Sequence, residues 1–116
     1  MQLTPFHIAI QVRDIDEARD FYGVKMGFSE GISAETWIDF NMFGHQLVTH
    51  LNPQLGKTGK IMNISNPVDG HGVPVPHYGV VMNFEEWEAF AQKVNGFIND
   101  FIIEPYVRFK GEQGEQ

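Results

Sequence analysis

Two stretches of the chain repeat one pattern of apolar and polar residues. The stretch FHIAIQV alternates over residues 6–12, and HYGVVMN alternates over residues 77–83. Such alternation is typical of a half-buried strand, because successive side chains point to opposite faces of a sheet. His7 and His77 each lie on the face opposite the bulkier apolar side chains. We therefore predict two strands, each with its histidine turned away from a helix-covered face.

An amphipathic helix is predicted after each of these strands. The motif D-x-x-E at 14–17 and, 69 residues later, N-x-x-E at 83–86 indicate an N-cap residue followed by an acid at the third helical position. Gly27 and Gly96 follow where a helix end favours a left-handed residue. Apolar residues recur between these signals at helical spacing: Ile15, Ala18 and Tyr22 in the first copy, and Phe84, Trp87, Ala91 and Val94 in the second.

The segment TWIDFNMFGHQLVTHL predicts a β-hairpin with its turn near Phe43-Gly44. Alternation in the returning strand places Leu47 and Leu51 on the face that should cover the helix. By the same rule, the opposite face of this strand lies on the side of the sheet where His7 is expected. That opposite face carries Gln46, Val48 and His50.

The remaining segments complete a predicted α+β fold. Residues 101–109 are predicted to form a strand, and the Gly- and Pro-rich residues 53–74 a linker with a short extended piece. The fold is a single domain, 1–116, of two β-α-β-β(-β) modules in a pseudo-twofold arrangement around a concave mixed sheet. Module one spans 4–52, and an incomplete module two spans 75–116.

Composition narrows the class of protein. A chain of 116 residues with 42% hydrophobic content fits one globular domain. No cysteine is present, so disulfides and thiolate chemistry are excluded. A net charge of −7 without a basic stripe argues against nucleic-acid binding. No apolar run approaches the ~20 residues that span a bilayer, and the start lacks a signal-peptide pattern, so we expect a cytoplasmic protein without membrane contact.

Three stretches carry a resemblance to a known family: FHIAIQVRDIDEARDFYGVKMGF near the start, FGHQLVTHL in the hairpin, and VPHYGVVMN opening the second copy. With them the chain resembles the vicinal oxygen chelate superfamily, which includes glyoxalase I, extradiol dioxygenases, and the fosfomycin and bleomycin resistance proteins. These stretches are spread over residues 6–83 of the chain. The opening pattern of a strand histidine, a D-x-x-E helix and F-Y-x-x-x-x-G is specific to the superfamily and not to one activity.

The resemblance implies a metal site. Superfamily members are similar in holding one divalent metal on the concave face, with ligands from the first and last strands of each module. Carried over, this implies His7 and His77 as first-strand ligands. The usual spacing places the third ligand at Val48, which cannot coordinate; His50, two residues on and on the same face, is the more plausible donor, and Gln46 less so. Imidazole ligands suit Fe, Mn, Ni, Co or Zn, so a divalent metal is the expected cofactor.

The resemblance also concerns the end of the chain. Superfamily members close the second module with a strand that carries a glutamate ligand. The repeat offset places the counterpart of that position just beyond Gln116. We therefore expect the last strand of module two to be missing, which leaves an open sheet edge. An open edge invites pairing with another chain, and a homodimer is expected.

Several side chains are candidates for lining a substrate pocket. They are Trp37, Asp39, Gln46, Tyr106 and Arg108. Structural roles compete with these assignments, because a strand histidine is commonly a hydrogen-bonded wall residue and an arginine on an edge strand is commonly solvated.

Three functions remain open from the sequence. The first is a metal-dependent enzyme of the glyoxalase/dioxygenase type that acts on a small oxygen-rich substrate. The second is a non-catalytic protein that binds or sequesters a small molecule, like the bleomycin resistance proteins. The third is a truncated, non-catalytic remnant stabilised by self-association. Kinship of fold does not choose between them.

Overall fold

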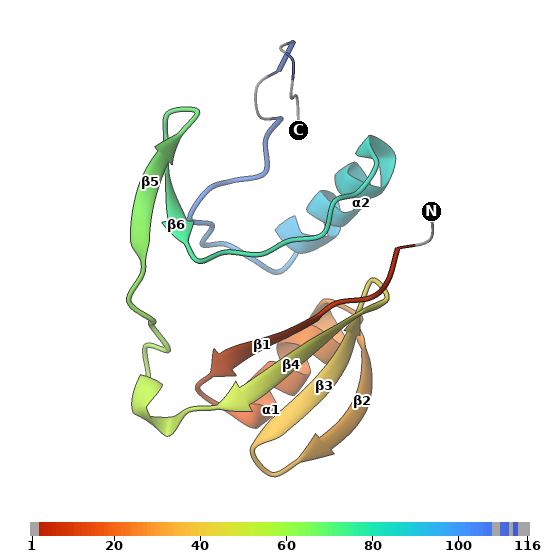
Figure 1. Cartoon of the computed structure of the whole chain (residues 1–116), viewed down its shortest axis with the longest axis vertical. Helices are drawn as coiled ribbons and strands as arrows, with labels where there is room; N and C mark the ends of the chain where they lie inside the picture. Colours follow the sequence, from red (N-terminus) through yellow and green to blue (C-terminus); the bar gives the residue numbers. More distant parts are fainter. Residues whose placement is uncertain (1–2, 108–109, 112, 114–116) are drawn as a thin grey trace. The chain divides into compact units, whose positions relative to one another are not determined.

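The computed structural model describes residues 3–107, 110–111 and 113. The chain divides into two compact units, Met1–Ile61 and Met62–Gln116, and each is described by itself. The two units combine sheet and helix, which confirms the α+β class (Figure 1).

Unit 1 is built on a four-stranded mixed sheet with the strand order β1-β4-β3-β2. β1 runs parallel to β4, and the β3–β4 and β2–β3 pairs are antiparallel. A helix formed by α1 and the π-helical segment η1 packs across one face of this sheet (Figure 1). The elements are β1 (His7–Val12), α1 (Ile15–Ala18), η1 (Arg19–Lys25), β2 (Ser29–Ala34), β3 (Trp37–Met42), β4 (His45–Leu51) and the short 3-10 turn η2 (Pro53–Leu55).

The helix begins and ends where the sequence predicts. The side chain of Asp14 accepts a hydrogen bond from the backbone N–H of Glu17 at 2.7 Å, which satisfies an otherwise orphan donor. Gly27 follows the helix with φ of 79°, a left-handed conformation that glycine adopts without steric cost.

The core of unit 1 lies between the helix and the sheet. Its largest fully buried side chains are Phe40, Ile38, Leu47 and Thr49. The Thr49 hydroxyl donates to the carbonyl of Ile38 at 3.3 Å, so the one buried polar residue there has a partner. The predicted alternation of β4 is confirmed, since Gln46 and His50 are exposed on the other face. Val48 lies on the same face as Gln46 and His50, but its side chain is buried.

The hairpin between β3 and β4 turns at Phe43 and Gly44, as predicted. Both residues have positive φ, 52° and 88°, as a two-residue mirror-image turn requires. Asn41 supports this turn, because its side-chain oxygen accepts a hydrogen bond from the N–H of Gly44 at 2.7 Å. Turn chemistry therefore fixes the register that places β3 against β4.

Unit 2 contains a second hairpin, β5 (Ile64–Val68) with β6 (His71–Val75), and the helix α2 (Phe84–Asn95). The hairpin corrects the prediction of a linker over 53–74. Its turn residues, Asp69 and Gly70, have φ of 48° and 78°, the same turn chemistry as in unit 1.

The helix α2 follows its predicted pattern only in part. Its cap is confirmed, because Asn83 accepts a hydrogen bond from the N–H of Glu86 at 2.8 Å. The prediction for Gly96 is wrong: its φ is −71°, and its N–H closes the last turn onto Lys93. Trp87, expected in the core, is half-buried.

Two predicted strands are absent from the described residues. Residues 77–83 and 101–107 belong to no strand, and residues 108–109 lie outside the described part of the chain. Alternation predicts which side chains would share a face of a strand. A strand also needs hydrogen bonds to a neighbouring strand, and none of the described residues pairs with either stretch in this way. In the part of the chain described here, none of the helices has the length and apolar character needed to cross a bilayer.

Candidate functional site

The face of the unit 1 sheet turned away from the helix collects most of the predicted site residues. We call it the polar face and define it by His7, Ala9, Gln11, Trp37, Asp39, Asn41, Gln46, Val48 and His50. Strand register arranges it in three cross-strand rows. The first row is His7, Gln46 and Asn41; the second is Ala9, Val48 and Asp39; the third is Gln11, His50 and Trp37.

His7 is held by its row neighbour. The Nδ1 atom of His7 lies 3.0 Å from Oε1 of Gln46 across the β1–β4 pair. An amide oxygen can only accept, so Nδ1 carries the proton in this arrangement and Nε2 keeps its lone pair. Gln46 therefore orients the imidazole and leaves Nε2 available to a ligand, a proton or a metal.

His50 cannot complete a site with His7. Gln46 is the register partner of His7, and His50 lies four residues further along β4, opposite Gln11. At about 3.3 Å per residue, the two histidine rows are about 13 Å apart along the strands. Metal–imidazole bonds of about 2.1 Å do not span that separation. His7 and His50 are therefore too far apart to share one ion, and the described residues include no cluster of three or more His, Cys, Asp or Glu that could hold a metal.

The remaining predicted residues belong to unit 2. The Nδ1 atom of His77 lies 2.8 Å from the carbonyl oxygen of Pro74, and this contact does not involve Nε2. The ring of Tyr106 packs on His71 with centroids 4.8 Å apart. Arg108 lies outside the described residues.

Asp39 occupies the middle row of the polar face without a counter-charge. None of the four strands of unit 1 carries a lysine or arginine. The other strand carboxylate, Glu30, is paired with Arg19 at 2.6 Å. The half-buried Asp39 side chain accepts no hydrogen bond and forms no ion pair with any described residue. Gly31 leaves room for it, since a Cβ at that position would lie 3.4 Å from Oδ2 of Asp39.

A depression of about 430 Å³ opens at one end of the polar face. Its walls carry hydrogen-bonding side chains outside the predicted substrate-binding set, including Ser29 and Asn41. His45 also lines it; its Nδ1 accepts a hydrogen bond from the N–H of Phe6 at 3.0 Å. The lining residues are Pro5, Ser29, Glu30, Gly31, Asp39, Phe40, Asn41, Gly44, His45 and Gln46. The structure places Ser29 and Asn41 in one register row, and the sequence carried no signal for Ser29, because β2 is exposed along its length.

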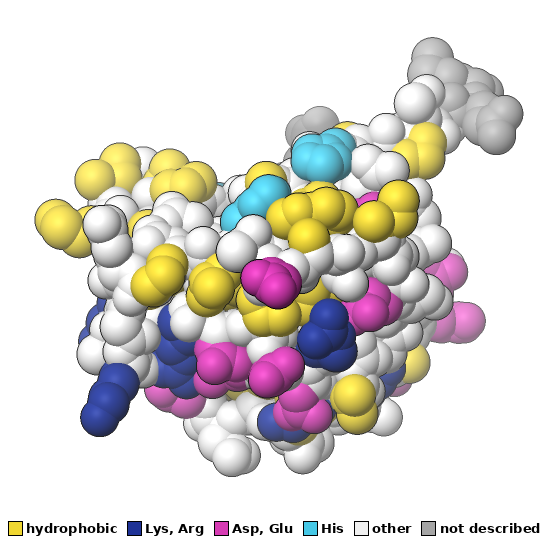
Figure 2. Space-filling model, turned by 90° about the horizontal axis from the view of Figure 1, so that it is seen from below, with side chains coloured by type: hydrophobic (Ala, Val, Ile, Leu, Met, Phe, Trp, Pro, Cys, Tyr) yellow, Lys and Arg dark blue, Asp and Glu magenta, His cyan; other side chains and the backbone are white. Residues whose placement is uncertain are grey.

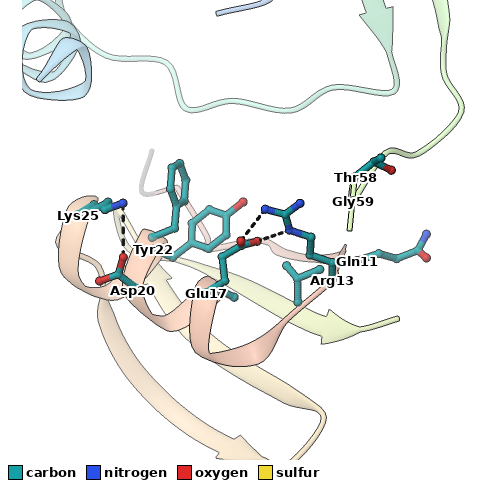
Figure 3. Close-up of a pocket in the computed structure, with 11 residues that line it drawn as sticks. Gln11, Arg13, Glu17, Asp20, Tyr22, Lys25, Thr58 and Gly59 are labelled. Atoms are coloured by element: carbon teal, nitrogen blue, oxygen red, sulfur yellow. Dashed lines mark hydrogen bonds and ion pairs between the residues drawn. The ribbon is translucent and has the colours of Figure 1, made fainter. Parts of the chain in front are cut away.

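A second depression, of about 470 Å³, lies on the helix side of unit 1 and is shown in Figure 3. Arg13 donates to Glu17 at 2.8 and 2.7 Å and also to the carbonyl of Lys57. The hydrogen bond and the charge of Arg13 lower the pKa of Glu17, and the hydrogen bond that Arg13 donates to Glu17 raises the pKa of Arg13. Lys25 lies 3.5 Å from Asp20. Because these charges neutralise one another, this depression has little preference for an ion.

Charges of both signs are also mixed on the surface in Figure 2. On the face in view, lysine and arginine side chains lie among aspartates and glutamates and do not gather in one patch.

Comparison with solved structures identifies the fold. The chain is similar to the crystal structure of a glyoxalase/bleomycin resistance protein/dioxygenase from Alicyclobacillus acidocaldarius, with a TM-score of 0.74 and 26% identity, over 97% of this chain and 76% of that one. The fold is that of the glyoxalase/bleomycin resistance/dioxygenase proteins. The resemblance to the vicinal oxygen chelate superfamily is thus confirmed. No protein-family model matches the sequence, and the search of curated proteins finds no match.

Proposed function

We propose that the chain is a small-molecule-binding protein of the glyoxalase/bleomycin resistance type and that its ligand lies on the polar face of unit 1. The observation that carries this proposal is the depression of about 430 Å³ at the end of that face. Small-molecule sites commonly have volumes of about 300–1,000 Å³ and a few convergent polar groups. Ser29, Asn41 and Gln46 supply such groups, next to the half-buried Asp39.

The donor geometry favours binding over metal catalysis within unit 1. His7 is the one imidazole in its register row, and His50 is about 13 Å away along the strands. An amide oxygen such as that of Gln46 is a weaker donor for Fe, Ni or Zn than imidazole or carboxylate. Unit 1 by itself therefore does not fit a three-ligand metal site.

Titration of the 15N-labelled full chain with catechol, an oxygen-rich probe, tests the proposal. Binding on the polar face should shift the amide signals of Asp39, Asn41 and Gln46. Ser29→Phe should fill the depression and weaken catechol binding at least tenfold. Ser65→Phe, a matched change at an exposed strand serine of unit 2, should leave binding unchanged. Absence of shifts on the polar face, or equal effects of the two variants, would refute the assignment.

We propose metal dependence as the second candidate function, because one specific observation favours it. The Nδ1 atoms of His7 and His77 each face an oxygen acceptor, at 3.0 and 2.8 Å, and neither contact uses Nε2, whose lone pair could bind a metal. Metal-binding histidines commonly have this arrangement, in which the second nitrogen is held by an oxygen. A bound divalent ion, Fe, Mn, Ni, Co or Zn, would supply Lewis-acid chemistry to adjacent substrate oxygens.

Metal content of the untagged chain tests this second candidate. After loading with each ion and removal of the excess, near-stoichiometric metal should be found in the wild-type chain. His7→Ala and His77→Ala should each lower it, whereas His71→Ala, a matched control in unit 2, should not. A folded chain that retains no ion would exclude metal dependence.

We also propose that the chain is a homodimer. Among the described residues, β1 and β2 are the edges of the unit 1 sheet, and edges with free backbone groups favour pairing with another chain. Light scattering of the purified chain should give twice the mass of 13.2 kDa. A constant monomer mass over the micromolar range would contradict this.

A further inference from the structure

We infer that the polar face selects a ligand with a positive charge attached to an aromatic or apolar body. This inference rests on the proposed function and names the chemical class of its ligand. Asp39 supplies the negative charge, and Trp37, two residues away on the same strand and face, supplies an aromatic surface.

The electrostatic argument begins with the absence of a competing cation. β1, β2, β3 and β4 contain no lysine or arginine, and Glu30 is already paired with Arg19. Asp39 is thus the only strand carboxylate of unit 1 that has no recorded partner among the described residues. Because Asp39 is half-buried, its charge is less screened by water than that of a fully exposed carboxylate. An ammonium group placed there would be attracted by Asp39, and the four strands of unit 1 offer no lysine or arginine to repel it.

Geometry allows one ligand to use Asp39 and Trp37 together. Residues two apart on a strand are separated by about 7 Å, which matches a benzyl or similar group with a cationic nitrogen at one end. An indole ring also attracts cations to its face, within about 6 Å of its centre. Gly31 keeps the space beside Oδ2 of Asp39 free of a side chain.

Three probes of similar size separate charge from shape: benzyltrimethylammonium, benzyl alcohol and benzoate. Each is titrated into the 15N-labelled full chain at pH 8, where histidine charge is low, in 20 mM salt. We expect benzyltrimethylammonium to bind five- to tenfold more tightly than benzyl alcohol, and benzoate to bind most weakly. The preference should shrink in 500 mM salt.

Two variants assign the effect. Asp39→Asn should abolish the preference for the cation over benzyl alcohol, whereas Trp37→Leu should weaken the binding of both probes. Asp20→Asn is the matched control: it removes the same charge from the helix side of unit 1 and should change nothing.

The outcomes separate this inference from the function on which it rests. If all three probes shift polar-face signals with equal affinity, the cationic preference is refuted and small-molecule binding stands. If Asp20→Asn removes the preference as fully as Asp39→Asn, net charge and not this site explains it, and the inference also fails. If no probe shifts a polar-face signal, the binding function and the ligand class fail together.

Discussion

The hydrogen bond between His7 and Gln46 makes a quantitative prediction about the imidazole. Gln46→Leu removes the amide oxygen that lies 3.0 Å from Nδ1 of His7, the one ring contact recorded for His7 among the described residues. Both side chains are exposed, so the net value of this bond is at the lower end of the usual range, about 0.5–1 kcal/mol. At about 1.4 kcal/mol per tenfold, the population of the Nδ1-protonated tautomer should fall about two- to fivefold relative to the other.

Long-range 1H–15N correlation spectra of the imidazole at pH 8 measure this ratio directly. Gln11→Leu is the matched control, because Gln11 has the same side-chain type on the same face, on the strand that carries His7, but accepts a hydrogen bond from Asn52 at 2.6 Å. It should leave the His7 tautomer unchanged. Unfolding free energy should fall by no more than about 1 kcal/mol in either variant, since both positions are on the surface and each variant loses one exposed hydrogen bond.

Two results would refute the reasoning about Gln46. An unchanged tautomer ratio in Gln46→Leu would mean that the hydrogen bond does not orient the ring in solution. Equal changes in Gln46→Leu and Gln11→Leu would mean that the ratio responds to general polarity of the face. In either case Gln46 would lose its assigned role in presenting Nε2 of His7.

Three further predictions concern stability, each measured by urea unfolding. Because Arg13 lowers the pKa of Glu17, the unfolded state binds the proton at higher pH than the folded state. The small stabilisation by this exposed pair is present at pH 7 and lost towards pH 3, and Glu17→Gln should flatten that loss. An identical pH dependence in the variant would count against the pair. Asp14→Ala should cost about 0.5–2 kcal/mol through the lost cap, more than Asp16→Ala at a neighbouring exposed acid. Leu47→Ala should cost about 2–5 kcal/mol, and a cost below 1 would contradict its full burial.

Features set by neighbouring residues were predictable from the sequence. The Asp14 cap, the left-handed Gly27 and the Phe43-Gly44 turn each depend on contacts within about four positions. Their residue types have strong local preferences for those conformations, whatever the rest of the chain does. The hydrophobic side of β4 was also predictable, because it follows from alternation along a single strand.

Features that depend on a partner strand were not predictable in the same way. β2, with the sequence SEGISA, is exposed along its length and has no apolar alternation to show it. β5 and β6 each contain a proline, which argues against a strand, although the Asp69-Gly70 turn was a usable signal. Residues 77–83 alternate well but have no ladder within the described part of the chain.

The same distinction applies to the candidate site, where some features were predictable from alternation and others depended on strand pairing. Alternation correctly placed His7, Gln46 and His50 on one face, and the structure places Trp37 and Asp39 there too. It could not give the register between β1 and β4, which are 39 residues apart where His7 meets Gln46. Residues on one face share an environment, but only residues in one row share a ligand atom, and that distinction separates His7 from His50.

The two proposals for the polar face, metal binding through His7 and cation binding by Asp39, predict opposite preferences for the charge of the ligand. A divalent ion bound through His7 would add positive charge to the face that carries Asp39, and it would favour substrates with anionic oxygens. Without an ion, Asp39 dominates the field and favours cations. Adding Fe(II), Mn or Zn to the chain should therefore reverse the order of benzyltrimethylammonium and benzoate if His7 is a ligand. If benzyltrimethylammonium still binds more tightly than benzoate at saturating metal, and also in His7→Ala, then Asp39 sets the charge preference of the polar face and the protein is a binder of cationic small molecules.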